Sequence, residues 1–335
     1  MSQNEFTARF GLEVPIAQAG MAFAGMTPAL AAAVAAGGGL GSIAVGAAPA
    51  MAVDAYAAGF AEAAPGKPLN LNHIVHFTTD EHIEALCRNK PAVASFHWGH
   101  PNTDWIAALR DAGISVWEQV GTVEAAELAV ADGVEVVVAQ GTEAGGHNFA
   151  TLPTLAFVPA VVDAVGDRAF VLAAGGVVDG RSLAAVMALG ASGGWVGTRL
   201  IATPESSAAD EYTERLVAAT SADTVLTSMF GPEHADFNPM RVVRNGIVAE
   251  FEHRPDDVPA TTDGQPVIGH MDLLGQPLDM ERFSFWVPMT GATGDFDQLA
   301  LPAGEGVGRV DAITAAADVM RTMSADAARI LAATP

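Results

Sequence analysis

The segment with the clearest chemical potential runs from Gln140 to Asn148 and reads Gln-Gly-Thr-Glu-Ala-Gly-Gly-His-Asn. It directly follows the apolar run Val134–Ala139, which is typical of a strand buried on both faces of a parallel sheet. Glycines let backbone N–H groups approach a ligand closely, and the imidazole of His147 can move a proton near neutral pH. We therefore expect His147 to be a catalytic residue beside a bound ligand.

Two further glycine turns follow apolar runs in the same way. Gly175-Gly176 comes after residues 169–174, and Gly197-Thr198-Arg199 comes after Trp195-Val196. In a barrel these turns would follow strands 7 and 8, whose loops commonly form a phosphate site. The alternative is that they are ordinary tight turns between a strand and a helix.

The elements that would position these loops alternate along the chain. Strand-like runs occupy residues 14–19, 40–45, 69–75, 92–96, 115–120, 134–139, 169–173 and 195–198, and helix-like runs occupy residues 28–36, 80–88, 103–112, 123–132, 155–165 and 181–189. About eight such units favour a closed (β/α)8 TIM barrel. An open Rossmann sheet is the less favoured alternative, because no G-x-G-x-x-G follows a strand.

The pattern changes towards the C-terminus. Residues 205–220 still have helical character, whereas residues 224–301 are irregular and rich in Pro, Asp and Met. So long a stretch is unusual for a plain loop. We therefore expect a barrel over residues 1–220, a smaller inserted lid or substrate lobe over 221–302, and a segment over 303–335 whose helix, 313–331, packs back on the barrel.

The composition restricts the partners. A formal net charge of -23 argues against nucleic acid and against an anionic membrane surface. The apolar stretch 17–60 is interrupted by Pro28, Pro49 and the glycines 37–39, so it is not expected to span a membrane. The one cysteine, Cys87, excludes an intrachain disulfide. With no secretory signal in residues 1–14, we expect a cytoplasmic protein that acts on a small molecule.

Two H-x-x-H pairs, His73 with His76 and His97 with His100, raise the question of a metal. A zinc or iron site usually also requires a fixed carboxylate or thiolate. We therefore assign no metal and expect histidines that hydrogen-bond or contact the substrate, with His97 the one that faces the ligand.

Several of these segments together resemble the nitronate monooxygenase (2-nitropropane dioxygenase) family. The similarity is carried by residues 15–21 with 27–31, 38–42, 95–99, 119–123, 143–147 and 303–308. The resemblance implies an FMN-bound barrel that oxidises alkyl nitronates with O2, with His147 as the catalytic histidine and His97 near the substrate. By position it implies that Gly175, Gly176, Gly197 and Thr198 hold the FMN phosphate, that Ala19, Gly20, Met21, Asn72, Gln119 and Gln140 line the flavin ring or ribityl chain, and that Gly145 and Gly304 are backbone neighbours of the flavin.

The sequence also departs from that family. Many members of the family carry tyrosines and a lysine in the C-terminal substrate region. This chain has only Tyr56 and Tyr212 and no lysine after Lys90, and it has Glu305 where the family usually has glutamine. These departures keep open an NAD(P)H-dependent flavin reductase of quinones or enoyl thioesters. A non-catalytic binder of FMN or of another phosphate ligand and a metal-dependent barrel hydrolase are weaker alternatives. A homodimer is compatible with each of them.

Overall fold

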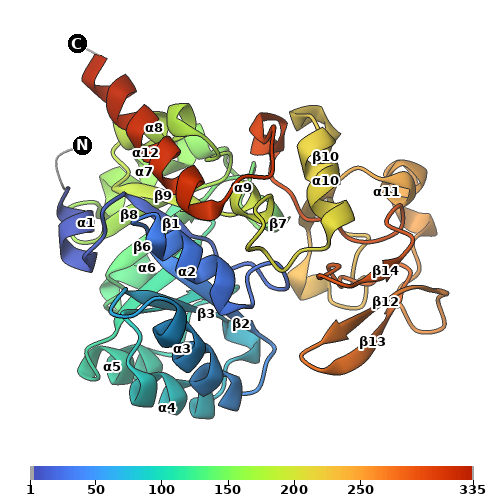
Figure 1. Cartoon of the computed structure of the whole chain (residues 1–335), viewed down its shortest axis with the longest axis horizontal. Helices are drawn as coiled ribbons and strands as arrows, with labels where there is room; N and C mark the ends of the chain where they lie inside the picture. Colours follow the sequence, from blue (N-terminus) through green and yellow to red (C-terminus); the bar gives the residue numbers. More distant parts are fainter. Residues whose placement is uncertain (1–3, 334–335) are drawn as a thin grey trace.

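The computed structural model describes residues 4–333. In this part of the chain eight parallel strands form one sheet in the order β1-β9-β8-β6-β5-β4-β3-β2 (Figure 1). The strands are β1 (Ile16–Gln18), β2 (Gly41–Gly46), β3 (Leu69–Ile74), β4 (Val93–His97), β5 (Ser115–Val120), β6 (Val136–Gln140), β8 (Phe170–Ala174) and β9 (Gly193–Val196). A parallel bridge between Ala17 and Leu40 joins the two edges. The predicted (β/α)8 barrel is therefore confirmed.

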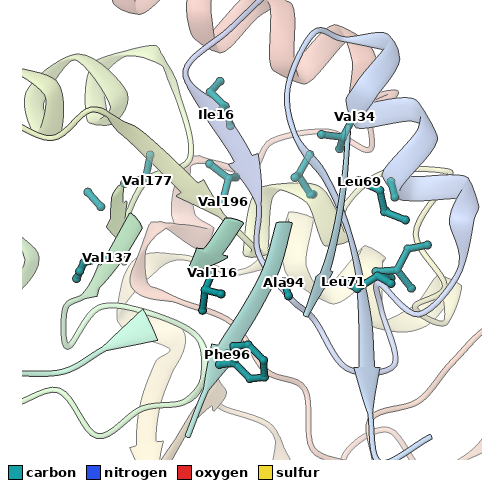
Figure 2. Close-up of a cluster of buried hydrophobic side chains, with 14 of the residues drawn as sticks. Ile16, Val34, Leu69, Leu71, Ala94, Phe96, Val116, Val137, Val177 and Val196 are labelled. Carbon is teal, nitrogen blue, oxygen red and sulfur yellow. The ribbon is translucent and has the colours of Figure 1, made fainter. Parts of the chain in front are cut away.

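Helices cover the outside of this barrel. They are α2 (Pro28–Ala36), α3 (Met51–Ala63), α4 (Asp80–Asn89), α5 (Thr103–Asp111), α6 (Val123–Ala131), α7 (Thr154–Val165) and α8 (Gly180–Ala188). Local signals start them: the Asp179 carboxylate accepts from the N–H groups of Arg181 and Ser182 at the start of α8. Outward-facing strand residues such as Phe96, Val116 and Val137 pack under the helices and form the main core (Figure 2).

A second cluster fills the barrel interior. Helix α1 (Glu5–Phe10) inserts Phe6 and Phe10 against Trp117, with ring centroids 5.7 Å and 5.0 Å apart. These rings are buried together with Trp195 and Leu172. The barrel interior is therefore packed with side chains, as expected for this fold.

The chain after β9 builds a smaller lobe beside that end of the barrel (Figure 1). Its elements are α9 (Thr198–Ile201), α10 (Asp210–Ala218), β10 (Thr224–Thr227), β11 (Met240–Val243), α11 (Gly246–Phe251), β12 (Val267–Leu273), β13 (Gln276–Glu281) and β14 (Thr293–Gly294). β11 also pairs with β7 (Gly146–His147), which belongs to the loop after β6. The loop after β6 therefore forms one edge of a sheet of the lobe.

The chain then returns to the barrel. The 3-10 turn η5 (Glu305–Arg309) leads into α12 (Ala316–Ala333), which packs on α8 and α2. None of the described helices is both long enough and apolar enough to cross a membrane.

Some element predictions were wrong. The helix expected over 205–220 is confined to Asp210–Ala218, the terminal helix begins at Ala316, and α3 was not predicted. α3 was missed because its alanine-rich sequence merges with the buried apolar stretch before it. The region 224–301, expected to be irregular, contains short antiparallel strands. Strands of two to seven residues joined by proline-rich turns leave little alternation to detect.

Candidate active site

A cavity of about 310 Å³ lies at the carboxyl ends of the barrel strands, between their loops and the lobe. The structure brings the predicted site residues together here. Those that line the cavity are Ala19, Gly20, Met21, His97, Gln119, Gln140, Gly145, His147, Gly175, Gly176, Gly197, Thr198 and Gly304. They come from the ends of six different barrel strands or the loops after them, and from the segment before η5, which is the arrangement expected for a barrel enzyme.

Asn72 is the one predicted site residue that does not line the cavity. Its side chain is buried, and its Nδ2 donates to Ser95 Oγ at 2.8 Å. A Cβ placed on Gly20 would lie 1.9 Å from Asn72 Oδ1, so Asn72 sits directly behind Gly20. Asn72 therefore packs against Gly20 on the side away from the cavity. Any side chain at position 20 would clash with Asn72, which explains the glycine.

His147 is held from two sides. Its backbone pairs with that of Met240 of the lobe in the antiparallel β7–β11 ladder. Its ring Nδ1 lies against the backbone carbonyl of Phe237. A carbonyl can only accept, so Nδ1 carries the proton and Nε2 has the lone pair. No described residue bonds Nε2.

Burial lowers the pKa of His147 to about 4. The imidazole is therefore uncharged at neutral pH. It can take up a proton at Nε2, as a general base does.

A second imidazole, that of His97, lies in the same cavity. Its Nδ1 donates to the backbone carbonyl of His73 at 3.2 Å, which leaves Nε2 as an acceptor. Burial, together with the electrostatic effect of the nearby His147, lowers the pKa of His97 to about 4. The two imidazoles cannot easily be charged together, so the cavity offers two neutral proton acceptors.

The glycine turns expose unpaired backbone donors. Gly175 and Gly176 have φ of +106° and +71°, a region that glycine adopts without strain. Among the described residues no partner is found for the N–H groups of Gly176, Gly197 and Thr198. Unpaired backbone N–H groups that line a cavity can bind an anion such as a phosphate.

The segment before η5 closes this part of the cavity. The Gly304 N–H donates to Thr198 Oγ1 at 3.0 Å, and the Glu305 N–H donates to the Glu143 carbonyl at 2.9 Å. A Cβ on Gly145 would lie 2.4 Å from the Gly304 nitrogen. Gly145 and Gly304 are therefore in direct backbone contact, which links the loops after β6 and β9.

Gln140 leaves a polar atom unsatisfied in the cavity wall. Its Nε2 donates to the His147 carbonyl at 3.3 Å, whereas its buried Oε1 has no partner among the described residues. A buried acceptor without a donor costs free energy. A ligand with an N–H group at this position would supply the missing donor.

The H-x-x-H histidines do not converge. His73 is fully buried, whereas His76 and His97 line the cavity. His100 bonds Glu118 at 2.8 Å and Asp132 at 3.0 Å outside the cavity. Within residues 4–333 no group of three His, Cys, Asp or Glu side chains is arranged to hold a metal ion.

The sequence analysis missed two aromatic residues beside His147. The Trp98 ring lies 4.9 Å from that of His147 and adopts a positive φ of +67°, which is uncommon for a bulky residue. Phe237 comes from the lobe turn η3 (Ala235–Phe237). Trp98 could have been suspected from its position next to His97, but no local signal marks Phe237.

Comparison with known proteins agrees with this site. The family model described as nitronate monooxygenase matches residues 48–326. A nitronate monooxygenase of Pseudomonas aeruginosa is 36% identical over 299 residues, covering 76% of this chain and 84% of that protein. A bicyclic carboxyl-CoA dehydrogenase of Mycobacterium tuberculosis, (3aS,4S,5R,7aS)-5-hydroxy-7a-methyl-1-oxo-octahydro-1H-indene-4-carboxyl-CoA dehydrogenase, is 34% identical over 254 residues, covering 75% and 68%.

Solved structures extend the likeness to the whole chain. FabK from Thermotoga maritima has a TM-score of 0.82 at 28% identity, covering 99% of this chain and 98% of that one. A nitroalkane oxidase from Streptomyces ansochromogenes has a TM-score of 0.79 at 25% identity, covering 99% and 100%. The match to the family model spans most of the barrel, the whole lobe and more than half of the terminal helix, so this chain belongs to the nitronate monooxygenase family of oxidoreductases.

Proposed function

We propose that this protein is an FMN-dependent oxidoreductase that oxidises alkyl nitronates, and the nitroalkanes that give rise to them, with O2 as the terminal oxidant. The observation that carries the proposal is the uncharged His147, whose Nε2 is free in a cavity that also contains unpaired glycine N–H groups.

The residues present fit FMN. The N–H groups of Gly176, Gly197 and Thr198 suit its phosphate. The orphaned Oε1 of Gln140 suits an N–H group of the flavin ring. Ala19, Gly20 and Met21 give the cavity apolar lining that suits the flavin ring. When bound, FMN supplies the two-electron acceptor that amino-acid side chains lack.

In this proposal His147 performs the proton chemistry. A neutral nitroalkane has an acidic C–H group, and His147 Nε2 accepts that proton to give the nitronate. The carbonyl of Phe237 keeps Nδ1 protonated, so that the lone pair always faces the substrate. His97 holds a second acceptor close by. The lobe and the aromatic side chains of the cavity exclude water from these steps.

A second candidate is an NAD(P)H-dependent flavin reductase that acts on a quinone or an enoyl thioester. It is favoured by the similarity to FabK over 99% of the chain and to a carboxyl-CoA dehydrogenase at 34% identity. The same glycine turns and the same neutral histidines would serve that reaction.

The visible spectrum of the purified protein, followed by anaerobic additions, separates the candidates. We expect a flavin spectrum that is bleached by nitroethane or its nitronate and not by NADH or NADPH. Bleaching by a nicotinamide alone would replace the first candidate with the second. A colourless protein that does not take up added FMN would contradict both.

A further inference from the structure

We propose that a second cavity, separate from the candidate active site, binds a phosphate group. The cavity has a volume of about 450 Å³ and is lined by α8, α12 and the end of η5. It lies where α12 runs beside α8 (Figure 1). Among the described residues only Val178 lines both cavities. The inference goes beyond the proposed function, because the FMN phosphate is assigned to the glycine turns of the first cavity.

The observation that carries the proposal is the buried guanidinium of Arg199. Arg199 is 8% exposed and lines the second cavity. Its Nη1 donates to the Ala202 carbonyl at 3.2 Å, and no described residue accepts from its Nε or Nη2. The Thr314 N–H donates to the same carbonyl, and Thr314 also lines the cavity, so the guanidinium lies at the cavity wall. A buried cation with unused donors is costly, and a ligand with acceptor oxygens would satisfy it.

The charges around Arg199 are balanced, in contrast to those of the chain as a whole. The chain has 16 Lys and Arg residues against 39 Asp and Glu residues. The charged residues that line the second cavity are Arg181, Arg199, Arg309, Arg329, Asp179, Asp311, Asp318 and Asp326. Four arginines thus face four aspartates in a protein with a large excess of acidic groups. An anion is repelled less here than the net charge of the chain suggests.

Three of the four carboxylates already have arginine partners. The ion pairs are Asp179 with Arg181 and Arg309, Asp318 with Arg321, and Asp326 with Arg329. Asp311 is exposed and forms no ion pair among the described residues. Burial lowers the pKa of Arg199, and the Asp311 carboxylate acts in the opposite direction. Asp311 is therefore the carboxylate that competes with a ligand for Arg199.

Phosphate is the anion that fits these donors. The planar guanidinium of Arg199 can donate from Nε and Nη2 to two oxygens of one oxyanion. Arg309 is more than half exposed, and its Nε lies 3.7 Å from Asp179, which is longer than a hydrogen bond. Its guanidinium is therefore free to turn towards a ligand. A phosphate group offers three strong acceptor oxygens and a charge close to -2, whereas a carboxylate offers two oxygens and a single charge.

The test is isothermal titration calorimetry of the full-length, flavin-loaded protein at pH 8 with inorganic phosphate and, separately, with acetate at the same low ionic strength. The proposed function assigns the glycine turns to the flavin phosphate, so the added phosphate reports on the second cavity. We expect one phosphate to bind per chain, at least tenfold more tightly than acetate. Absence of saturable phosphate binding, or equally tight binding of acetate, would overturn the proposal.

Two variants locate the phosphate. Arg199→Met is expected to weaken phosphate binding at least tenfold, because it removes charge-assisted hydrogen bonds. Arg168→Met is the matched control. The Nη2 of Arg168 also donates to one backbone carbonyl, that of Ala164 at 2.8 Å, but Arg168 lines neither cavity. Its phosphate affinity should be unchanged, and equal affinities of the two variants would overturn the assignment.

A third variant tests the site without altering a buried residue. Asp311→Asn removes the competing carboxylate from an exposed position. We expect it to tighten phosphate binding about threefold, the effect of one exposed charge. An unchanged or weaker affinity would overturn the proposal even if Arg199→Met failed to fold.

These measurements separate the inference from the proposed function. Bleaching of the flavin by nitroethane tests the reaction, whereas phosphate binding requires no turnover. A protein that oxidises nitroethane but binds phosphate equally well with and without Arg199 would keep the function and lose the inference. A protein that takes up no FMN would contradict the function, and the variants would still test the inference, because Arg199 and Asp311 do not line the first cavity.

Discussion

The Nδ1–H group of His147 donates to the backbone carbonyl of Phe237, a residue 90 positions later in the chain. The barrel thus contributes the imidazole, and the lobe determines which of its nitrogens carries the proton. The β7–β11 pairing also fixes the backbone of His147. If the lobe moved away from the barrel, the imidazole would therefore lose both its fixed position and the hydrogen bond that keeps its Nδ1 protonated. If His147 is the base of the proposed reaction, the lobe is part of the catalytic unit.

Replacing the base should remove turnover and spare the flavin. We expect His147→Gln to lower kcat/KM for nitroethane by about 10²- to 10⁴-fold, the usual contribution of a general base, while the dissociation constant of FMN changes less than twofold. His270→Gln is the control, because His270 is exposed on β12 and bonds only Asp279. Retention of full activity by His147→Gln would show that the base is another group.

The pH dependence follows from the lowered pKa of the same group. Burial keeps the His147 pKa at about 4, and only the unprotonated ring can accept a proton. For a nitroalkane that stays neutral, kcat/KM should therefore be constant above about pH 5 and fall tenfold per unit below about pH 4. Circular dichroism at each pH controls for unfolding. An inflection near 6.5, the ordinary pKa of histidine, would show that the ring is hydrated in the working enzyme.

How far the sequence predicts this site depends on which half of the cavity is considered. The barrel half was predictable because buried strands are continuous apolar runs and the loops at their carboxyl ends carry the ligand. His147, Gly176 and Thr198 could be placed from that rule. The position of Asn72 could not, because whether it faces the ligand or packs against Gly20 depends on the close approach of β3 to the loop after β1, where even a Cβ on Gly20 would meet the Asn72 side chain.

The lobe half was not predictable for a different reason. Phe237 and Trp286 take their places through pairings between distant residues, such as Met240 with His147. The strands that carry these pairings are only two to seven residues long. Local periodicity therefore contains little of the information, and the proline- and aspartate-rich sequence resembles a loop.

The phosphate turn can be tested with two glycines that differ only in location. Gly176 has φ of +71° and Gly66 has φ of +72°, and a Cβ at either would meet at most one atom, at 3.9 Å. Alanine should cost each position about 1–2 kcal/mol of stability from the left-handed backbone. Only Gly176→Ala places a methyl group at the phosphate-type turn, so only this variant should lose FMN affinity, by at least tenfold. Equal FMN affinities, measured by fluorescence quenching, would exclude this turn as the phosphate site.

A buried carboxyl group outside the cavity should make stability depend on pH. Glu118 lies on β5, is buried, and bonds His100, which also bonds Asp132. Burial raises the pKa of Glu118 from 4.5 to about 7, against the opposing effect of His100. The folded state therefore binds more protons than the unfolded state between these values, and this stabilising contribution is present at low pH and lost as the pH rises through 7.

Glu118→Gln replaces the ionisable carboxyl group by an amide that does not titrate and that has nearly the same shape. Between pH 5 and pH 8 we expect the wild-type free energy of unfolding to fall by about 1–3 kcal/mol more than that of the variant, the range that a shift of this size allows. Urea unfolding at both pH values gives the difference. Glu127→Gln on the exposed face of α6 is the control and should follow the wild type. If Glu118→Gln also followed the wild type, the pKa of Glu118 could not be raised by burial in the folded protein.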